Sequence, residues 1–289
     1  MLPVSETLAD SGLRGERMSR HVQLACLLEA AAPKPGNVSP GRDFADMTYA
    51  DLVRSALALG PVFADGRIRR RGVGELIGDG VRATTGVSES NTNLGIVLLF
   101  APLARAAVSR APGEPLRDAT ERTLAGLSVD DAGAAFEAIV LAHPGGLGAV
   151  PEHDVRGPAQ VTLREAMAAA ANRDLIASEY ASGYAIVFGE GLPLLTAALD
   201  DGAATLDAIV ALHVGLLAAH PDTLIARKAG IEAAAAVTAA AREVRDHKRP
   251  LAELDARLRG DGHRLNPGAT ADLVAATLLA ALETGIRLR

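Results

Sequence analysis

The chain has one cysteine, few aromatic residues and no excess of basic charge. With Cys26 alone, an intrachain disulfide is excluded, and a reducing, cytoplasmic compartment is expected. Aromatic residues make up 3% of the 289 and tryptophan is absent, so alanine and branched aliphatic side chains must fill the core, which suits closely packed helices. The net charge of -6 argues against nucleic acid as the main partner, because binding phosphates requires a basic surface.

Long apolar runs are missing as well. The densest apolar stretch, residues 94–103, has about half the ~20 residues that a membrane-spanning helix needs. The first residues carry charges at Glu6, Asp10 and Arg14 and lack the apolar centre of a signal peptide. We therefore expect neither a membrane span nor a secretion signal.

The hydrophobic pattern is helical almost throughout. Apolar residues recur at the i, i+3, i+4 spacing, as at Leu24, Leu27 and Leu28, and no segment alternates convincingly with period two. Three segments have the capping-box pattern that precedes a helix: Thr48 to Asp51, Ser128 to Asp131 and Thr162 to Glu165. Helices are predicted at residues 14–31, 49–59, 73–83, 93–109, 115–126, 129–142, 163–171, 173–187, 192–199, 204–218, 222–246, 250–258 and 270–285.

These patterns predict an all-α fold with a single large multi-helix domain over residues 14–289. Hydrophobic residues make up 49% of the chain, which is ample for one sizeable core. Residues 1–13 are expected to be disordered. The alanine-rich helices predicted at 222–246 and 270–285 are compatible with packing inside the monomer or across a homodimer.

The first turn-rich segment, residues 33–46, combines cationic and acidic side chains. Asp43 and Asp46 stand three residues apart, and such hard oxygen ligands suit Mg²⁺ shared with substrate phosphates. Lys34 is a cationic donor in the same loop. The alternative is a solvated loop with a helix-capping aspartate.

A second candidate segment surrounds the start of the helix predicted at 93–109. Glu75 and Asp79 share a helix face upstream of it. Four polar residues come directly before the apolar helix: Ser90, Asn91, Thr92 and Asn93. Free N–H groups at that helix start could hold phosphate oxygens, although an N-cap before a buried helix explains the same pattern.

Further polar residues follow later in the chain. His143 and His153 stand in a glycine-rich loop, which is weak evidence for a metal or proton-transfer site. Asp222 either caps the next helix or acts as a general base, with Arg227 and Lys228 binding phosphate. Two more candidates lie near the last predicted helix, where an acidic first turn is the alternative explanation: Asn266 and Asp272.

The order of these segments resembles the triphosphoribosyl-dephospho-coenzyme A synthase family, over roughly residues 20–285. The matching segments are the Pro33–Asp46 loop, the Gly86–Gly95 stretch, Asp222-Thr223 and Asn266 to Leu273. Two departures indicate a divergent branch similar to proteins of archaea and methylotrophic bacteria. Asn93-Leu94 replaces the usual His-Lys, and Asn37-Val38-Ser39 replaces the usual Leu-Val-Asp.

The resemblance implies a reaction in which the triphosphoribosyl part of ATP moves to a hydroxyl of dephospho-CoA and adenine is released. Asp46 and Asp222 are then the candidate catalytic bases. Mg²⁺ would be held by Asp43, Asp46, Glu75 or Asp79. The expected ligands of ATP are Lys34, Gly36, Asn37, Ser90, Asn91, Thr92, Asn93, Arg227, Lys228, Asn266 and Asp272. No residue is singled out for protonating the adenine.

Two other functions remain open at this point. One is a metal-dependent hydrolase of N-ribosyl bonds, in which water is the acceptor. The other is a non-catalytic nucleotide-binding protein in a tetrahydromethanopterin-linked one-carbon pathway. Release of adenine that depends on a second organic substrate would distinguish the transferase from both.

Overall fold

A computed structural model describes residues 4–64, 66, 68–88, 93–142, 154–260 and 262–288, with side chains from residue 16 onward. Within these ranges the chain is helical and contains no strand, which confirms the all-α prediction. The elements are α1 (Val4–Ala31), α2 (Tyr49–Phe63), the 3₁₀ turn η1 (Ile68–Arg70), α3 (Val73–Thr85), α4 (Leu94–Ser109), α5 (Leu116–Ala125), α6 (Val129–Leu141), α7 (Leu163–Ala170), α8 (Leu175–Ser182), the π-helical turn η2 (Val187–Gly191), α9 (Leu192–Asp200), α10 (Thr205–Ala219), α11 (Thr223–Ala229), α12 (Ile231–Arg245), α13 (Leu251–Arg259) and α14 (Gly268–Thr284).

The three predicted capping boxes are confirmed at the starts of α2, α6 and α7. Two predicted helices are wrong in their continuity, because a glycine interrupts each. Gly183 ends α8 in the left-handed conformation with φ of 69°. Gly230 has φ of 99° and separates α11 from α12. A positive φ favours glycine, and neither residue continues a helix. The disorder expected at residues 1–13 stays a prediction.

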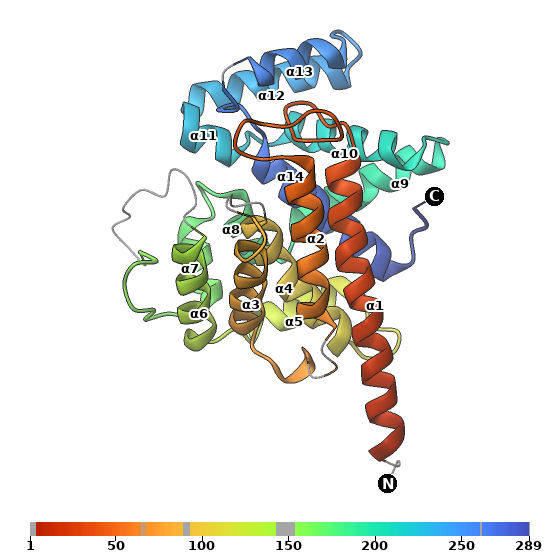
Figure 1. Ribbon diagram of the computed structural model, residues 1–289, viewed down its shortest axis with the longest axis vertical. Coiled ribbons are helices and arrows are strands. Elements are labelled where there is room, and N and C mark those ends of the chain that lie inside the picture. Colours follow the sequence, from red (N-terminus) through yellow and green to blue (C-terminus); the bar gives the residue numbers. More distant parts are fainter. Residues whose placement is uncertain are drawn as a thin grey trace.

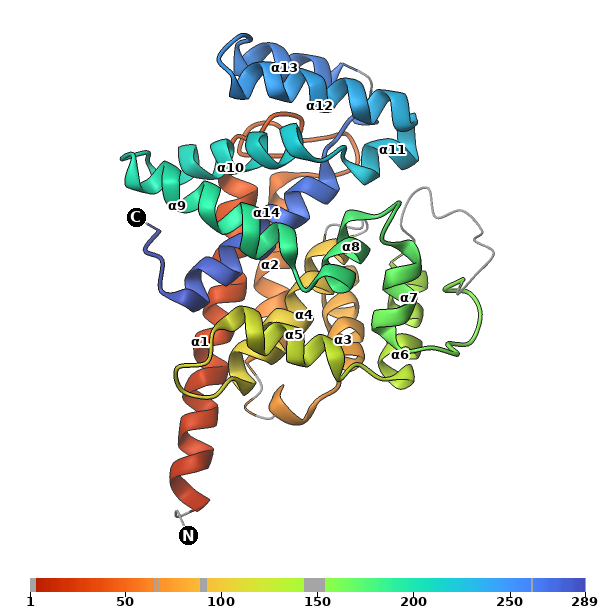
Figure 2. The ribbon, with the colours of Figure 1, turned by 180° about the vertical axis from the view of Figure 1, so that it is seen from behind.

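Helix α14 runs through the middle of the molecule (Figures 1 and 2). It packs on α1, α4 and α10, and most of its residues are buried. The small side chains of α14, among them Ala275, Ala276 and Ala280, are fully or almost fully buried and let its neighbours approach closely. A core poor in aromatic residues was predicted to suit closely packed helices, and the packing around α14 agrees with that prediction.

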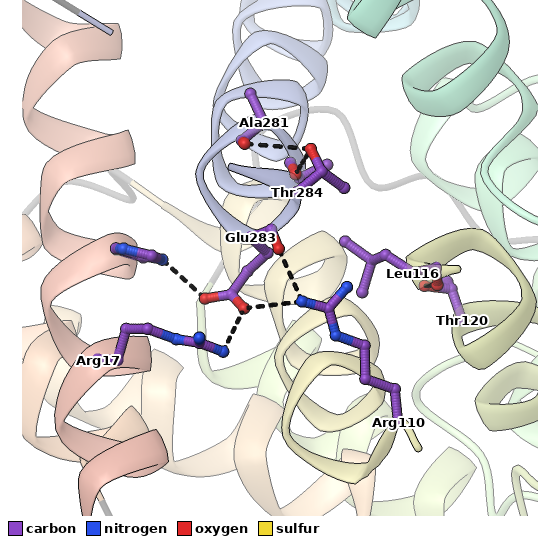
Figure 3. Close-up of polar contacts among 9 residues, drawn as sticks. Arg17, Arg110, Leu116, Thr120, Ala281, Glu283 and Thr284 are labelled. Carbon is purple, nitrogen blue, oxygen red and sulfur yellow. Dashed lines mark hydrogen bonds and ion pairs between the residues drawn. The ribbon is translucent and has the colours of Figure 1, made fainter. Parts of the chain in front are cut away.

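Glu283, near the end of α14, ties three helices together (Figure 3). Its side chain is 1% exposed and accepts a hydrogen bond of 3.1 Å from Arg17 of α1. His21 Nδ1, also on α1, lies 2.7 Å from the other carboxylate oxygen. Arg110, which follows α4, donates to the backbone carbonyl of Glu283 at 2.7 Å. These contacts fix the C-terminal ends of α4 and α14 to the middle of α1.

A second, smaller hydrophobic core lies under α11, α12 and α13. It contains nine buried residues: Leu217, Ala218, Ile225, Ala234, Val237, Ala240, Ala241, Leu254 and Leu258. These three helices form a layer at one end of the molecule, directly above the loop that joins α1 to α2 (Figure 1). Residues 34–39 of this loop are buried, whereas residues 40–43, 45 and 46 are exposed.

Within the described part of the chain, no single helix combines the length and apolar character needed to cross a membrane. Two bent helix pairs, α8 with η2–α9 and α10 with α11, pass that test only when taken together and only by length and composition.

Candidate active site

The loop at residues 33–46 is anchored to α1 through Lys34. Its side chain is fully buried, and Nζ lies 2.9 Å from Oε1 of Glu29. The same ammonium donates to the backbone carbonyls of Glu29 and Ala32. Three acceptors match its three hydrogens, so Lys34 holds the loop on the end of α1. Glu29 was not among the sequence candidates, since a glutamate inside a predicted helix reads as a surface residue.

His213 of α10 belongs to the same buried region. Burial first, and then the charge of Lys34, lower its pKa well below the usual value. Neither ring nitrogen has a hydrogen-bond partner among the described residues. His213 is therefore a neutral imidazole beside the loop anchor.

Asp255 of α13 holds the same loop from the other side. It accepts a hydrogen bond of 2.9 Å from the backbone N–H of Gly36 and is paired with Arg42 and Arg259. Gly36 has φ of 76°, and a Cβ there would lie 2.7 Å from the Cβ of Leu258. Only glycine fits this position, because both the conformation and the space exclude a side chain.

Two of the four asparagines predicted to bind the nucleotide, Asn37 and Asn266, are in contact with each other. Nδ2 of Asn37 donates to Oδ1 of Asn266 at 2.7 Å, and the backbone carbonyl of Asn37 accepts from Arg259. Oδ1 of the buried Asn37 accepts no hydrogen bond from the part of the chain that the structure describes. The structure thus brings the first loop beside the segment that precedes α14.

The acidic end of the loop is exposed. Oδ1 of Asp43 accepts a hydrogen bond of 2.7 Å from the N–H of Tyr49, at the start of α2. Asp46 is exposed to solvent. Between them, the buried ring of Phe44 stacks on His263 with ring centroids 3.7 Å apart. This stacking fixes the loop between its two aspartates.

Asp222 is fully buried at the start of α11. One of its oxygens accepts from the N–H groups of Leu224 and Ile225, at 2.9 and 3.0 Å. The other accepts from the N–H and the hydroxyl of Thr270, at 2.7 and 2.8 Å. Burial raises the pKa of this carboxyl, and the four hydrogen bonds oppose the increase. Asp222 therefore joins the start of α11 to the first turn of α14.

Asp272 lies one turn into α14, with its carboxyl against the start of α4. A Cβ on Gly95 would lie 2.0 Å from Oδ2 of Asp272 and 2.5 Å from its Cγ. The residue is half-buried, and no described residue donates a hydrogen bond to it or forms an ion pair with it. The glycine thus allows a carboxyl to lie directly on the backbone of α4.

The pKa of Asp272 is raised well above its usual value. Burial is the largest cause, and the carboxylates of Glu29, Asp222 and Asp174 add to it in that order. The positive charge of Arg227 opposes them. These effects also show that residues from α1, α8 and α11 lie around Asp272, because charge effects of this kind act over short distances.

Asp174 connects α8 with α11. It caps α8 by accepting from the N–H groups of Ile176 and Ala177, and it pairs with Arg227 at 2.7 Å. The hydroxyl of Thr223 accepts from the N–H of Leu175 at 3.3 Å. Asp174 was missed from the sequence, although an aspartate just before a helix is a typical cap.

Asn93 is the N-cap of α4, but its side chain makes no capping bond. The side chain is buried, and Nδ2 donates to no atom of the described residues. Three predicted ligands, Ser90, Asn91 and Thr92, lie outside the described residues. His143 and His153 lie outside them as well.

Two predicted metal ligands lie on α3 in structural contacts. Glu75 accepts from the N–H of Gly72 at 2.8 Å and caps the helix. Asp79 forms ion pairs with Arg71 and Arg82. Over the described ranges, no three His, Cys, Asp or Glu residues form a group that could hold a metal ion. Ligation of Mg²⁺ by Asp43, Asp46, Glu75 and Asp79 stays a prediction.

The starts of α4, α8, α11 and α14 thus lie around Asp272, and the loop at 33–46 is joined to this region through the Lys34–Glu29 pair and the Asn37–Asn266 contact. The chain matches the ATP:dephospho-CoA triphosphoribosyl transferase family (CitG) over residues 15–287, and it belongs to that family. It is a transferase that moves the triphosphoribosyl group of ATP to dephospho-CoA. A hydrolase or a non-catalytic binding protein is not favoured.

A solved structure agrees with this assignment. It is that of a protein from Archaeoglobus fulgidus, provisionally named a triphosphoribosyl-dephospho-coA synthase, with 29% sequence identity and a TM-score of 0.65. The match covers 81% of this chain and 99% of that one. No protein with a curated description matches this chain.

Proposed function

We propose that ATP binds where the starts of α4, α8, α11 and α14 meet, with Asp272 at the centre, and that dephospho-CoA approaches from the loop at 33–46. The observation that supports this most is the convergence of residues from four segments that the family resemblance singled out. Asn37 touches Asn266, Asp222 bonds to the first turn of α14, and Asp272 lies against Gly95.

The triphosphate is proposed to bind at the start of α4. The N–H groups of a helix start and its dipole favour an anion, and the unpaired amide of Asn93 is a donor at the same place. Lys228 is exposed and its ammonium forms no ion pair with a described residue, so it is available for phosphate. Arg227 is held nearby by Asp174.

Lys34 and Asp222 are proposed to hold parts of the site in position. Lys34 holds the loop at 33–46 on α1, and Asp222 joins the start of α11 to α14. Each already has its hydrogen-bonding capacity filled, Lys34 by Glu29 and two carbonyls, and Asp222 by four donors. Asp46 is exposed and is the remaining sequence candidate for the base that deprotonates the acceptor hydroxyl.

Mg²⁺ is proposed to accompany ATP. This ion usually keeps several waters and binds through one or two carboxylates together with substrate phosphates, so a ready-made cage is not required. Asp43 and Asp46 are the candidate carboxylate ligands in the loop.

The proposal is tested by incubating the protein with ATP and Mg²⁺, with and without dephospho-CoA. Mass spectrometry would follow free adenine and the triphosphoribosylated product. We expect adenine only when dephospho-CoA is present. Equal release without the acceptor would indicate hydrolysis and contradict the proposal.

The phosphate contact is tested by Lys228→Ala, with Lys248→Ala as the matched control. Lys248 is a similarly exposed lysine that follows α12 and pairs with Asp246. The first variant should raise the KM for ATP, while the second should leave it unchanged. Equal effects would show that the two lysines act only through the net charge.

A further inference from the structure

We infer that Asp272 is the general acid that donates a proton to a ring nitrogen of the departing adenine. The inference rests on the proposed placement of ATP and adds a role that no sequence feature assigns. Three features of this carboxyl support the role: its position against α4, the lack of a hydrogen-bond donor or ion-pair partner among the described residues, and the groups that surround it.

The position of Asp272 is fixed by close packing. Its carboxyl lies against Gly95, so that even one methyl group there would overlap with Oδ2. Gly95 is the second residue of α4, next to the start where the triphosphate is placed. A ribose attached to that triphosphate therefore lies within reach of Asp272, together with the base that leaves from its C1′.

The carboxyl is also available for proton transfer. Asp222, on the adjacent helix, is fully buried and accepts four hydrogen bonds, whereas the half-buried Asp272 accepts none from a described residue. A group that is already saturated with hydrogen bonds cannot give a proton to a substrate without losing them. Of the two carboxyls, Asp272 is the one that is free to act.

The surroundings of Asp272 favour its protonated form. Cys26 and Glu29 face it from α1, Asp174 from α8, and Asp222 and Arg227 from α11. Three of these are carboxyls, whose negative charges oppose ionisation of a fourth. Arg227 is the one cation among them, and it is already paired with Asp174. The pKa of Asp272 is accordingly raised well above its usual value.

The bond between N9 of adenine and C1′ breaks, and its electron pair goes to adenine. The proton of Asp272 goes to a ring nitrogen, so adenine leaves neutral. The acceptor oxygen bonds to C1′ and gives its proton to a base, for which Asp46 is proposed. Exchange with water then returns a proton to Asp272.

The test compares the wild type, Asp272→Asn and the control Asp207→Asn, which changes an exposed carboxylate of α10. Adenine release in a single turnover and the Kd for ATP are measured between about pH 6 and pH 9. We expect Asp272→Asn to slow release about 10²–10⁴-fold, as for loss of a general acid, with the Kd changed less than about threefold. Asp207→Asn should behave as the wild type.

The pH profile separates an acid from a residue that only shapes the site. In the wild type, release should decline as the pH rises and Asp272 loses its proton, and this decline should be absent in Asp272→Asn. A wild-type rate without that decline overturns the inference, even if the variant fails to fold. A loss in ATP affinity in Asp272→Asn that equals its loss in rate would also overturn the inference.

Two outcomes distinguish the role of Asp272 from the transferase activity itself. If the wild type releases no adenine in the presence of dephospho-CoA, the proposed function itself is wrong. If the wild type releases adenine and Asp272→Asn releases it equally fast, the proposed function stands and only the role of Asp272 is wrong.

Discussion

The hydroxyl of Tyr180 donates a hydrogen bond of 2.6 Å to the backbone carbonyl of Leu98, the one carbonyl of α4 that Pro102 leaves without its helical partner. Proline has no N–H, so the bond from residue 102 back to residue 98 cannot form. A side chain also replaces the missing N–H donor in α2, where Gln23 donates to the carbonyl of Leu57, four residues before Pro61.

Tyr180→Phe should therefore destabilise the protein by about 1–3 kcal/mol, because a buried carbonyl loses its donor. Tyr184→Phe is the matched control. Its hydroxyl donates to Leu99, whose carbonyl also has the N–H of Leu103 available within α4. Denaturant unfolding should show a clearly smaller loss for Tyr184→Phe. Equal losses would mean that Pro102 does not determine the effect.

The buried carboxyl of Glu179 should make the stability of the fold depend on pH. Burial raises its pKa to about 7, against hydrogen bonds from the N–H groups of Val187 and Ile186. A carboxyl with a raised folded-state pKa binds more protons in the folded than in the unfolded state. Its contribution to the free energy of unfolding is therefore full below about pH 4.5 and decreases as the pH rises to about 7.

The size of this change is about 3 kcal/mol, from about 2.5 pH units at 1.36 kcal/mol each. Chemical unfolding of the wild type and of Glu179→Gln between pH 5 and pH 8 measures it. We expect the wild type to lose stability relative to the variant as the pH rises. A constant difference between the two proteins would contradict the raised pKa.

Lys34→Met should destabilise the fold by about 3–5 kcal/mol, because it leaves the buried carboxylate of Glu29 unpaired. Replacing both partners, as in Glu29→Leu with Lys34→Met, should recover part of the loss. Thermal or denaturant unfolding of the two single variants and the double variant gives the coupling energy. Additive losses would show that the pair is not coupled.

Gly95→Ala tests whether the space beside Asp272 is needed for activity. The added methyl group must displace the carboxyl, so we expect adenine release to slow at least tenfold. Gly133→Ala is the matched control, since a Cβ there meets nothing within 4 Å in α6. It should leave activity unchanged and stabilise the helix by about 0.5–1 kcal/mol. Equal activity of the two variants would contradict the close packing.

The helices were predictable wherever their signals are local. Thr48, Ser128 and Thr162 each stand three residues before an acidic residue, and each begins a helix as expected. Gly183 and Gly230 were placed inside helices because an isolated glycine does not reveal its φ. Whether a glycine is tolerated within a helix or ends it depends on the packing of the elements on either side.

The site was predictable only in part, for a similar reason. Family resemblance singled out Lys34, Asn266 and Asp272, but it did not show that Lys34 is buried on Glu29. Asp255 was missed because its partner, the N–H of Gly36, is 219 residues away in the chain. Contacts at such separations leave no periodic trace in the sequence.

That separation has a consequence for how the protein is made. The loop at residues 33–46 leaves the ribosome early, but Asp255 and Asn266, which fix its shape, are among the last residues to emerge. The central helix α14 follows them. A nascent chain can therefore form α1 and α2 long before it can bind a nucleotide, and a protein shortened before residue 255 would lack a formed site however well its first helices fold.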